Sequence, residues 1–323
     1  MVSQGYKNQT LEQGEIKVAV IGSGYMAQEH IKVFSSISGV QVVGIYSRTK
    51  SKAQSVATQF GLAVVAETIS DLYEKTKADL LVVAVSEMSL YSVAKQAFQY
   101  PWLSLVEKPA GYNYENALLV KELSIRYQSQ VFVSFNRRYY SSTRSILDEL
   151  KQVEGQRLIQ VYDQEEPLLL DRPSEVHQNW MYANSIHVID YLNILGRGEI
   201  TRVVPVLHWV SENPGFVVAK IEYSSGDVGI YTAVWNAPGP WAVIVTTQEK
   251  RWELKPLEYA SVQPRGSREL QSLPNHIWDT EYKPGLRMQA EEVIKALRGN
   301  AYKLVSLDES LETMRLVKDI YEV

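Results

Sequence analysis

Short apolar blocks alternate with segments of helical periodicity through the first 135 residues of the chain. The blocks are rich in β-branched residues, which is typical of strands buried on both faces of a parallel sheet. They are Ile16–Ile21, Val40–Tyr46, Ala63–Val65, Asp79–Val85, Trp102–Val106 and Val131–Phe135. Amphipathic segments such as Lys52–Phe60 and Tyr91–Phe98 lie between them. This alternation predicts an α/β domain with a doubly wound parallel sheet.

The pattern changes after residue 135, where strand-like runs are joined by turn residues. The runs are Arg157–Tyr162, Arg202–Val210, Val217–Tyr223, Val228–Trp235, Trp241–Thr247 and Arg251–Leu254. No long helical segment separates the later runs, so we expect them to pair antiparallel. A chain of 323 residues is long enough for two domains, and the two patterns predict one in each half.

The turn after the first strand carries a glycine motif, G-x-G-x-x-A, formed by Gly22, Gly24 and Ala27. Gly22 permits a sharp turn, and Gly24 lets the backbone approach a pyrophosphate. Free N–H groups at the start of the next helix would then face the phosphates. Because a strand precedes the motif and a helix follows it, we predict a dinucleotide site. The alternative is a glycine-rich turn that binds nothing.

The end of the second strand is where such folds meet the adenosine ribose. An acidic residue there would hold the 2′-hydroxyl of NAD. The chain instead has Ser47, Arg48, Thr49 and Lys50, which suit a 2′-phosphate and favour NADP over NAD. The alternative is that Arg48 stacks on the adenine of either cofactor.

A triplet of Glu107, Lys108 and Pro109 follows the fifth apolar block. Proline restricts the backbone of the residue before it, so Lys108 is biased toward an extended conformation at the end of a strand. We expect its cation to project into the cofactor crevice. A solvated loop lysine is the alternative.

Composition and charge exclude several classes of function. The net charge is −4, which gives no reason to expect nucleic acid or an anionic membrane as a partner. Cysteine is absent, which excludes disulfides and thiolate chemistry and suits the cytoplasm. We find no apolar run long enough for a membrane span and no signal-peptide core. The five histidines show no metal-ligand spacing, so no metal is expected.

Several short motifs occur in one order along nearly the whole chain. They are GSGYMAQEH ending at His30, the Glu107-Lys108-Pro109 triplet, NRRYY at Asn136–Tyr140, HVIDYLNILG at His187–Gly196, and a terminal LDESLETMRLVKDIY. In this order and spacing the chain resembles the glucose–fructose oxidoreductase/inositol dehydrogenase (Gfo/Idh/MocA) family. The resemblance implies an amino-terminal Rossmann domain and a second, α+β domain with a large, mostly antiparallel sheet. We predict a tail over residues 1–14 and domains over 15–135 and 136–323.

The resemblance also implies an activity. Members of the family move hydride between NAD(P) and a carbon that bears a hydroxyl, on a sugar, polyol or nucleotide-sugar. Lys108 matches the lysine that holds the reacting hydroxyl, and His187 matches the histidine that serves as acid or base. The open face of the second sheet is commonly a subunit interface in the family, so a homodimer or homotetramer is expected.

The predicted site residues form two sets. The cofactor set is Gly22, Ser23, Gly24, Tyr25, Met26, Ser47, Arg48, Ser86, Glu107, Lys108 and Pro109. The substrate set is Lys108, Tyr112, Asn136, Arg137, Tyr182, Asn184 and His187. Aromatic faces and amide or guanidinium groups suit a polyhydroxylated ligand. Arg137 and Arg138 are expected either to bind the diphosphate of a nucleotide-sugar or to pair with the acidic run Asp163, Glu165 and Glu166.

Two positions depart from the family pattern. Ala183 stands four residues before His187, where related dehydrogenases often have Asp on the same helical face, and Asn184 cannot replace that base. The loop Val85-Ser86-Glu87 also replaces the usual Thr-Pro-Asn turn beside the nicotinamide. These changes favour two alternatives to a dehydrogenase. One is a regulatory member that binds cofactor and a sugar-like ligand, and the other uses tightly bound cofactor for a non-redox or internal-redox reaction.

Overall fold

The structure, a computed structural model, describes residues 14–211 and 215–323. Two compact units make up the chain. The first contains the residues up to Glu107 together with Glu122–Ser134 and Leu286–Ser306, and the second contains Lys108–Lys121, Phe135–Gly285 and Leu307–Val323. The predicted tail, apart from residue 14, lies outside the described residues, and the predicted domain limits stay a prediction. Residues 286–306 pack with the first unit although they follow most of the second in sequence.

The first unit is built on a six-stranded sheet of order β3-β2-β1-β4-β5-β6, in which every pair of neighbours is parallel. The strands are β1 (Ile16–Ile21), β2 (Val40–Tyr46), β3 (Val64–Val65), β4 (Leu80–Val83), β5 (Leu103–Glu107) and β6 (Val131–Ser134). The strand order reverses between β1 and β4, as in a doubly wound dinucleotide-binding fold. The predicted fold class of this half is confirmed.

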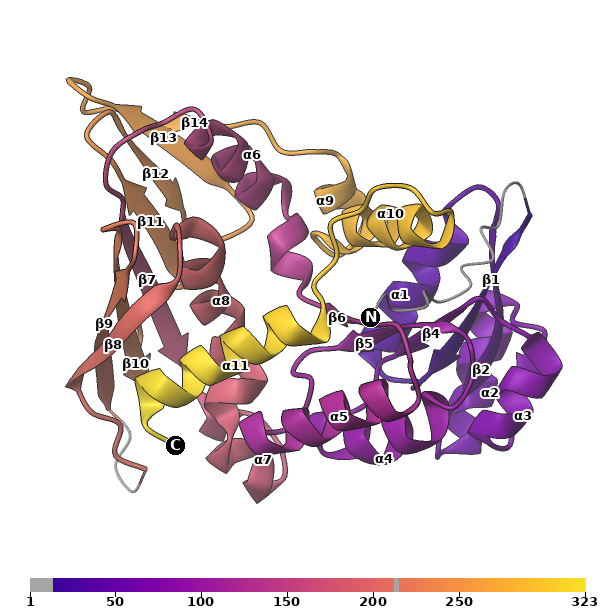
Figure 1. The fold of residues 1–323 in the computed structure, drawn as a ribbon. Helices are drawn as coiled ribbons and strands as arrows, with labels where there is room; N and C mark the ends of the chain where they lie inside the picture. The colour runs from indigo at the N-terminus through magenta and orange to yellow at the C-terminus, as the bar shows by residue number, and fades with distance from the viewer. Residues whose placement is uncertain (1–13, 212–214) are drawn as a thin grey trace, which may run out of the picture. The chain divides into compact units, whose positions relative to one another are not determined.

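Helices cover the sheet of the first unit on its two faces (Figure 1). They are α1 (Tyr25–Ser35), α2 (Lys50–Phe60), α3 (Ile69–Thr76), α4 (Glu87–Ala97), α10 (Leu286–Leu297) and the carboxyl-terminal part of α5 (Tyr114–Arg126). The apolar side chains of α1 face inward, with Ile31, Val33 and Phe34 fully buried. Helix α4 begins four residues before the predicted start at Tyr91, because its first turn is polar and escapes an apolar periodicity.

The second unit contains an eight-stranded sheet of order β14-β13-β12-β11-β7-β10-β9-β8. The strands are β7 (Leu158–Glu165), β8 (Ile200–Leu207), β9 (Phe216–Tyr223), β10 (Val228–Trp235), β11 (Ala242–Thr246), β12 (Lys250–Leu254), β13 (Ala260–Pro264) and β14 (Gln271–Ser272). Most neighbours are antiparallel, as predicted, but β7 and β10 pair parallel over their whole length. Strands β13 and β14 were not predicted.

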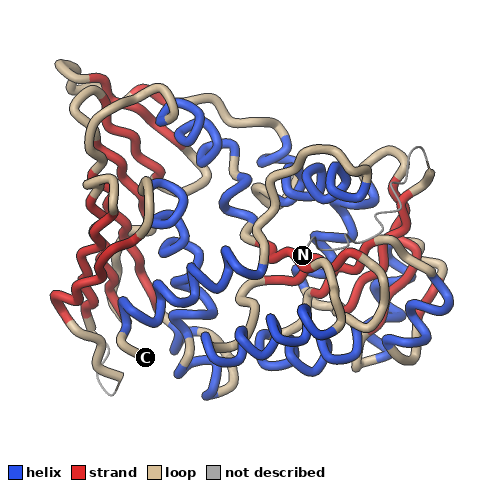
Figure 2. The backbone as a smooth tube through the Cα atoms, in the orientation of Figure 1, coloured by secondary structure: helices blue, strands red, loops and turns tan. Residues whose placement is uncertain are grey.

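Helices α6 (Ser141–Leu150), α8 (Ile186–Leu195) and α11 (Leu307–Tyr321) lie on one face of this sheet (Figures 1 and 2). Alternate side chains of the strands point toward them, and Val217, Ala219 and Ile221 of β9 are fully buried. The intervening side chains form the opposite, open face. Shorter elements complete the unit: η1 (Asn136–Tyr139), η2 (Pro167–Leu169), α7 (Ser174–Gln178), the π-helical turn η3 (Met181–Ser185) and α9 (Trp278–Glu281).

None of the helices in the described ranges has the length and apolar character needed to cross a lipid bilayer.

Candidate functional site

The glycine turn of the first unit has the geometry that a bound pyrophosphate needs. Gly22 has a φ of +122°, and a Cβ at this position would lie 2.1 Å from the carbonyl oxygen of Ala84. Gly24 precedes α1 and is exposed, and a Cβ there would meet no atom within 4 Å. The first turn of α1 has no acidic residue and no side-chain cap. Its amide groups therefore suit an external anion such as a pyrophosphate.

We expect the replacement of Gly22 by alanine to affect stability and the replacement of Gly24 by alanine to affect cofactor binding. Gly22→Ala should lower the free energy of unfolding by about 1–3 kcal/mol, because a Cβ is strained at this φ and collides with backbone. Gly24→Ala is the matched control, since its φ of −79° is ordinary and its Cβ enters open space. It should weaken NADH binding and leave urea unfolding unchanged. Equal stability of the two variants would contradict the assigned role of Gly22.

The end of β2 lies beside the glycine turn. Ser23 Oγ and Ser47 Oγ are 3.0 Å apart and share a hydrogen bond, and the Gly22 amide donates to the Tyr46 carbonyl at 2.9 Å. Arg48 is exposed, and among residues 14–211 and 215–323 its side chain has no partner. Lys50, by contrast, is paired with Glu67. The structure thus brings together the predicted pyrophosphate and ribose residues and leaves the Arg48 guanidinium available.

The carboxylate of Glu107, at the end of β5, contacts a buried histidine of α1. His30 Nε2 lies 2.7 Å from Glu107 Oε1, and the histidine is almost fully buried. This contact connects the helix of the glycine turn to the residue that precedes Lys108. Ser86 is exposed at the start of α4, where its hydroxyl contacts that of Ser89 at 3.1 Å.

In the second unit, the ammonium group of Lys108 is held by backbone. Its Nζ donates to the carbonyl of Ala183 at 2.6 Å, and the side chain is part-buried. The Lys108–Pro109 peptide bond is cis. Ala183 therefore binds the predicted reactive lysine through its main-chain carbonyl. The residue type at position 183 gives no indication of this contact, because every residue has such a carbonyl.

Ala183 lies in a π-helical turn, Met181–Ser185, directly before α8. A regular helix through this region was expected, which would put positions 183 and 187 one turn apart on the same face. A π turn is wider than an α turn, so this spacing does not hold. Asn184, predicted as a substrate ligand, instead donates to Glu165 of β7 at 2.9 Å.

The side chain of Glu165 is hydrogen-bonded to residues in and next to the π turn. It accepts hydrogen bonds from Trp180 Nε1 at 2.5 Å and Ser185 Oγ at 3.2 Å, in addition to that from Asn184. Burial, together with the neighbouring Asp163, raises the pKa of Glu165 to about 9. At neutral pH Glu165 is therefore protonated and hydrogen-bonded to Asp163.

Asp163 is the other member of this buried pair on β7. Its two oxygens accept from Tyr231 Oη and Trp241 Nε1, each at 2.6 Å. Asp163, Glu165 and Glu166 were expected to be open to the two arginines. Positions 163 and 165 instead alternate along the strand and point to one face, which the helices cover, and this alternation is visible in the sequence.

His187 stands in the first turn of α8 with an unusual environment. Burial, Arg137, Lys108 and Lys283 hold the pKa of His187 well below its usual range, so the imidazole is neutral at pH 7. Its Nδ1 atom is buried and has no hydrogen-bond partner among the described residues. A neutral ring in this position can accept a proton from a ligand hydroxyl.

The other predicted substrate residues differ in burial and in the contacts that their side chains make with the protein. Asn136 is buried and donates to the Pro284 carbonyl at 3.1 Å, and Tyr182 is buried with its pKa raised, mainly by burial. Tyr112 is part-buried. The guanidinium of Arg137 lies 4.1 Å from the centre of the Trp241 ring. The Nη1 atom of Arg137 is buried and has no hydrogen-bond partner among the described residues.

The neighbouring arginine has a structural role. Arg138 binds Asp190 through two hydrogen bonds of 2.7 Å and reaches Glu309 at 3.2 Å. Thr313 also donates to Asp190 at 2.8 Å. The expected pairing of Arg138 with the acidic residues of β7 is therefore wrong, because Asp190 on α8 accepts two hydrogen bonds from its guanidinium.

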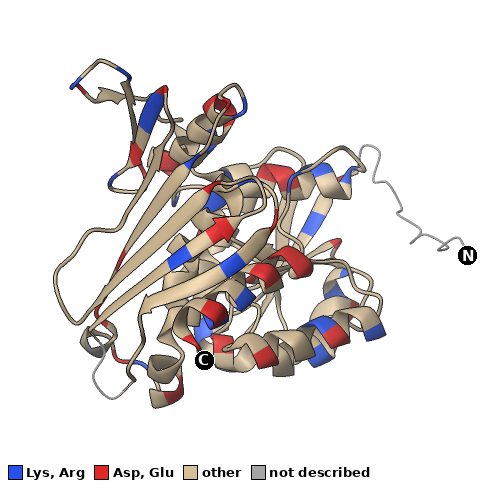
Figure 3. Ribbon diagram, turned by 60° about the vertical axis from the view of Figure 1, so that its left-hand side comes forward, with Lys and Arg blue, Asp and Glu red and all other residues tan. Residues whose placement is uncertain are grey.

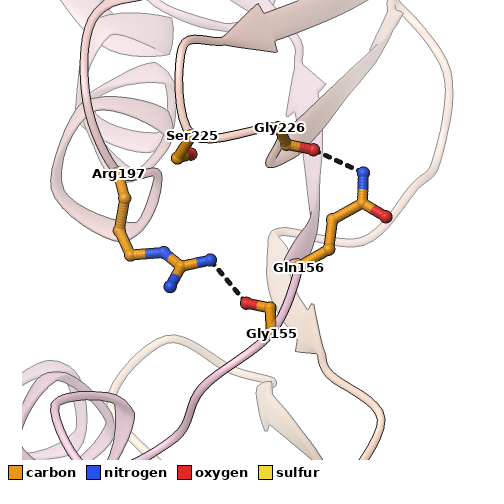
Figure 4. A pocket seen from close by; sticks show the side chains of 5 residues that line it. All are labelled: Gly155, Gln156, Arg197, Ser225 and Gly226. Atoms are coloured by element: carbon orange, nitrogen blue, oxygen red, sulfur yellow. Dashed lines mark hydrogen bonds between the residues drawn. The ribbon is translucent and has the colours of Figure 1, made fainter.

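A surface pocket of about 440 Å³ also lies in the second unit (Figure 4). Its lining residues are Gly155, Gln156, Arg197, Ser225 and Gly226. Arg197 is committed to Asp227 at 2.7 Å and to the Gly155 carbonyl. Because the only cation in the lining is already paired, and no predicted site residue contributes to the pocket, we do not assign it a function.

In the part of the chain that the structure describes, no group of three or more His, Asp or Glu side chains is arranged to hold a metal ion.

The sheet order and glycine turn of the first unit define a dinucleotide-binding Rossmann domain. Residues 16–135 match the model of the Gfo/Idh/MocA oxidoreductase family, described as an NAD-binding Rossmann fold. The match covers the first unit's sheet and glycine turn, and it agrees with the resemblance seen in the sequence motifs.

Relatives agree with this assignment over different lengths. The chain is 29% identical over 125 residues to a glucose-6-phosphate 3-dehydrogenase from Bacillus subtilis, a match that covers 39% of the chain but only 35% of that protein. A UDP-N-acetylglucosamine 3-dehydrogenase from Acidithiobacillus ferrooxidans has a similar structure, with a TM-score of 0.78, 15% identity and coverage of 95% of this chain and 97% of the other. The structure of a dehydrogenase from Clostridium difficile is also similar, with a TM-score of 0.77 and 19% identity. The match covers 94% of this chain and 98% of the other. These structural matches show that the two-sheet fold is shared.

Proposed function

We propose that the chain is an NAD(P)-dependent oxidoreductase that transfers hydride between a nicotinamide cofactor and a hydroxyl-bearing carbon of a sugar, polyol or nucleotide-sugar. The observation that carries the proposal is the family match over residues 16–135, with its open glycine turn. The names of two similar proteins, a glucose-6-phosphate 3-dehydrogenase and a UDP-N-acetylglucosamine 3-dehydrogenase, support a sugar as substrate.

The cofactor would be held mainly by the first unit. Gly22, Ser23, Gly24, Tyr25 and Met26 are assigned to the pyrophosphate, through backbone amides at the start of α1. Ser47 and Arg48 are assigned to the ribose, and Ser86, Glu107, Lys108 and Pro109 to the nicotinamide side. Bound NAD(P) would supply the carbon that accepts or returns hydride.

Two residues of the second unit would handle the proton. A neutral His187 is suited to take the proton of a substrate hydroxyl, and the positive charge of Lys108 favours the resulting alkoxide. The Ala183 carbonyl orients the lysine. In this assignment a histidine and a lysine suffice for proton transfer, and the missing aspartate at position 183 does not remove the activity. Tyr112, Asn136, Arg137, Tyr182 and Asn184 would contact the substrate or position the groups that do.

We assign NADP as the preferred cofactor. The end of β2 presents Arg48, which is exposed and without a partner in the described residues, and presents no carboxylate. Arg48→Glu should weaken NADPH binding by roughly tenfold or more and change NADH binding little, because it removes a charge-assisted contact with the 2′-phosphate. Fluorescence titration measures both, with Lys52→Glu on α2 as the control. Equal loss of both cofactors would instead place Arg48 on the adenine.

The open face of the second sheet is proposed as the surface that forms a homodimer or homotetramer. Strand β10 exposes part of Ile230, Thr232 and Val234 there. Most positions along these strands carry neither acidic nor basic side chains (Figure 3). Sedimentation velocity of the purified chain tests the oligomeric state.

The function as a whole is tested by titrating the purified chain with NADH and NADPH and then following nicotinamide absorbance across a panel of sugars, polyols and nucleotide-sugars. Cofactor binding with turnover supports the dehydrogenase. Binding without turnover on any substrate supports the regulatory alternative, and cofactor that stays bound through purification without exchange supports a non-redox or internal-redox reaction. Absence of cofactor binding contradicts the proposal.

A further inference from the structure

The π turn before α8 determines where the Lys108 ammonium group is held. The Ile186 amide donates to the Met181 carbonyl five residues back, which is the hydrogen bond of a π-helical turn. Ala183 lies in the middle of this turn, and its carbonyl accepts from Lys108 Nζ at 2.6 Å. Such turns are rare because a regular helix competes with them, so contacts outside the helix must favour the wider turn. The position of the lysine therefore depends on those contacts.

Three side chains on the two sides of Ala183 converge on one carboxyl group, that of Glu165. Trp180 Nε1 donates to Oε2 at 2.5 Å, Asn184 Nδ2 donates to the same oxygen at 2.9 Å, and Ser185 Oγ donates to Oε1 at 3.2 Å. Trp180 and Ser185 are buried. Because the donors come from both before and after Ala183, this carboxyl group fixes both ends of the segment that presents the carbonyl.

Glu165 is itself held rigidly. It is the last residue of β7, which lies inside the eight-stranded sheet between β10 and β11. Its backbone carbonyl accepts from the Asn236 amide at 2.7 Å, and the residue is 1% exposed. Asp163 on the same face is hydrogen-bonded to Glu165 and accepts from Tyr231 and Trp241. A buried, connected carboxyl pair on an interior strand gives the turn a fixed support.

A carboxylic acid has the hydrogen-bonding capacity that this position requires. Burial and Asp163 raise the pKa of Glu165 to about 9, so the side chain carries a proton at neutral pH. The proton is shared with Asp163, and the remaining lone pairs of the two oxygens accept from the tryptophan, asparagine and serine side chains. A glutamine at position 165 would keep one oxygen and one N–H, whereas an alanine would keep neither.

We propose that Glu165 is a positioning residue for the reactive lysine: its carboxyl group holds the π turn in the shape that presents the Ala183 carbonyl to Lys108 Nζ. The inference rests on the proposed function for the catalytic role of Lys108, but the position of this lysine can be measured without turnover. Glu165 acts through the turn and not on the substrate. Its loss should therefore lower kcat more than cofactor affinity, because a small displacement of a reacting group slows the chemical step.

The first test measures the lysine directly, by trace acetylation of the folded chain and mass spectrometry of its peptides. Lys151, which is exposed, is the internal reference. In the parent chain, partial burial and the bond to the Ala183 carbonyl should keep Lys108 less reactive than Lys151. Glu165→Ala should raise the ratio of the two rates by about threefold or more, and Glu165→Gln should keep it within about twofold of the parent chain.

The second test applies the same variants to turnover. Glu165→Ala should lower kcat by about tenfold to a hundredfold with the KM for NADPH changed little, and Glu165→Gln should restore most of the loss. Glu166→Ala is the matched control, because Glu166 is the next residue along the chain and accepts a hydrogen bond from Gln164. It should leave both the acetylation ratio and kcat unchanged.

A second variant keeps the proposal testable if Glu165→Ala does not fold. Trp180→Phe removes one of the donors and retains an aromatic ring, so it perturbs the buried network less. It should raise the acetylation ratio of Lys108 by about twofold. An unchanged ratio in folded Trp180→Phe or folded Glu165→Ala, or equal effects of Glu165→Ala and Glu165→Gln, overturns the proposal. A released lysine in a chain without any turnover would leave this inference standing and contradict the proposed activity.

Discussion

Replacement of Lys108 by methionine is expected to lower kcat by about 10²–10⁴-fold while cofactor binding stays nearly unchanged. Methionine is similar in length but carries no charge, so the hydroxyl of the substrate loses the cation that favours its alkoxide. The same change removes one of the positive charges that depress the pKa of His187, so the pKa should rise toward its usual range. Steady-state turnover and NADPH titration measure the first effect, and the pH profile of kcat measures the second.

Lys151→Met provides the control for this experiment. Lys151 belongs to the same unit and is 58% exposed, where it pairs with Asp148. Its replacement should leave kcat and the pH profile unchanged. Thermal unfolding of Lys108→Met is also needed, since the lysine holds the Ala183 carbonyl at 2.6 Å. A folded Lys108→Met variant with normal turnover would rule out the role assigned to this residue.

The second large effect is on stability and concerns Glu165. Its pKa of about 9 in the folded protein lies above the ordinary value of 4.5. The folded state therefore binds one more proton than the unfolded state between these two values, and the free energy of unfolding must fall as pH rises through that window. The slope contributed by this group is at most about 1.4 kcal/mol per pH unit. The stabilisation is fully present below pH 4.5 and is lost once pH exceeds about 9.

Glu165→Gln should remove this contribution. Glutamine is neutral at every pH, has nearly the same shape, and keeps an oxygen for Trp180 and an N–H for Asp163. We expect the variant to unfold at a higher temperature than the parent chain above pH 8 and to lose part of the decline in Tm with pH. Glu166→Gln is the control, because Glu166 follows in sequence and is less buried. A wild-type and a Glu165→Gln protein with parallel Tm profiles from pH 5 to 9 would contradict the protonated carboxyl.

Predictions were most accurate where one local pattern decides the structure. Val228–Trp235 has the predicted limits, since the strand pattern continues to its last residue. Strand β13 was missed because ASVQP is short, has two polar residues and ends in proline. Its membership of the sheet depends on pairing with β12, and that partner is not visible in the segment itself.

The parallel pairing of β7 with β10 illustrates a second limit. The strands are more than 60 residues apart, and their pairing places β7 between β10 and β11 at the centre of the sheet. Local spacing indicates only that later strands lack crossover helices, so it suggests antiparallel neighbours. Strand order depends on contacts between segments that are distant in sequence, and local sequence patterns do not show which distant strands pair.

The sequence by itself determined the Rossmann unit, its glycine turn and the position of Lys108 after a buried strand, because each depends on residues that are close together along the chain. The tertiary structure alone decided which charges are neutralised. Arg138 binds Asp190, whereas Arg137 stacks on Trp241 and pairs with no acid among the described residues, although the two arginines are neighbours in sequence with the same chemistry. Glu165 keeps its proton because burial and Asp163 make a second negative charge unfavourable. Charge and proton occupancy follow from burial and distance, which are set only when remote segments pack together.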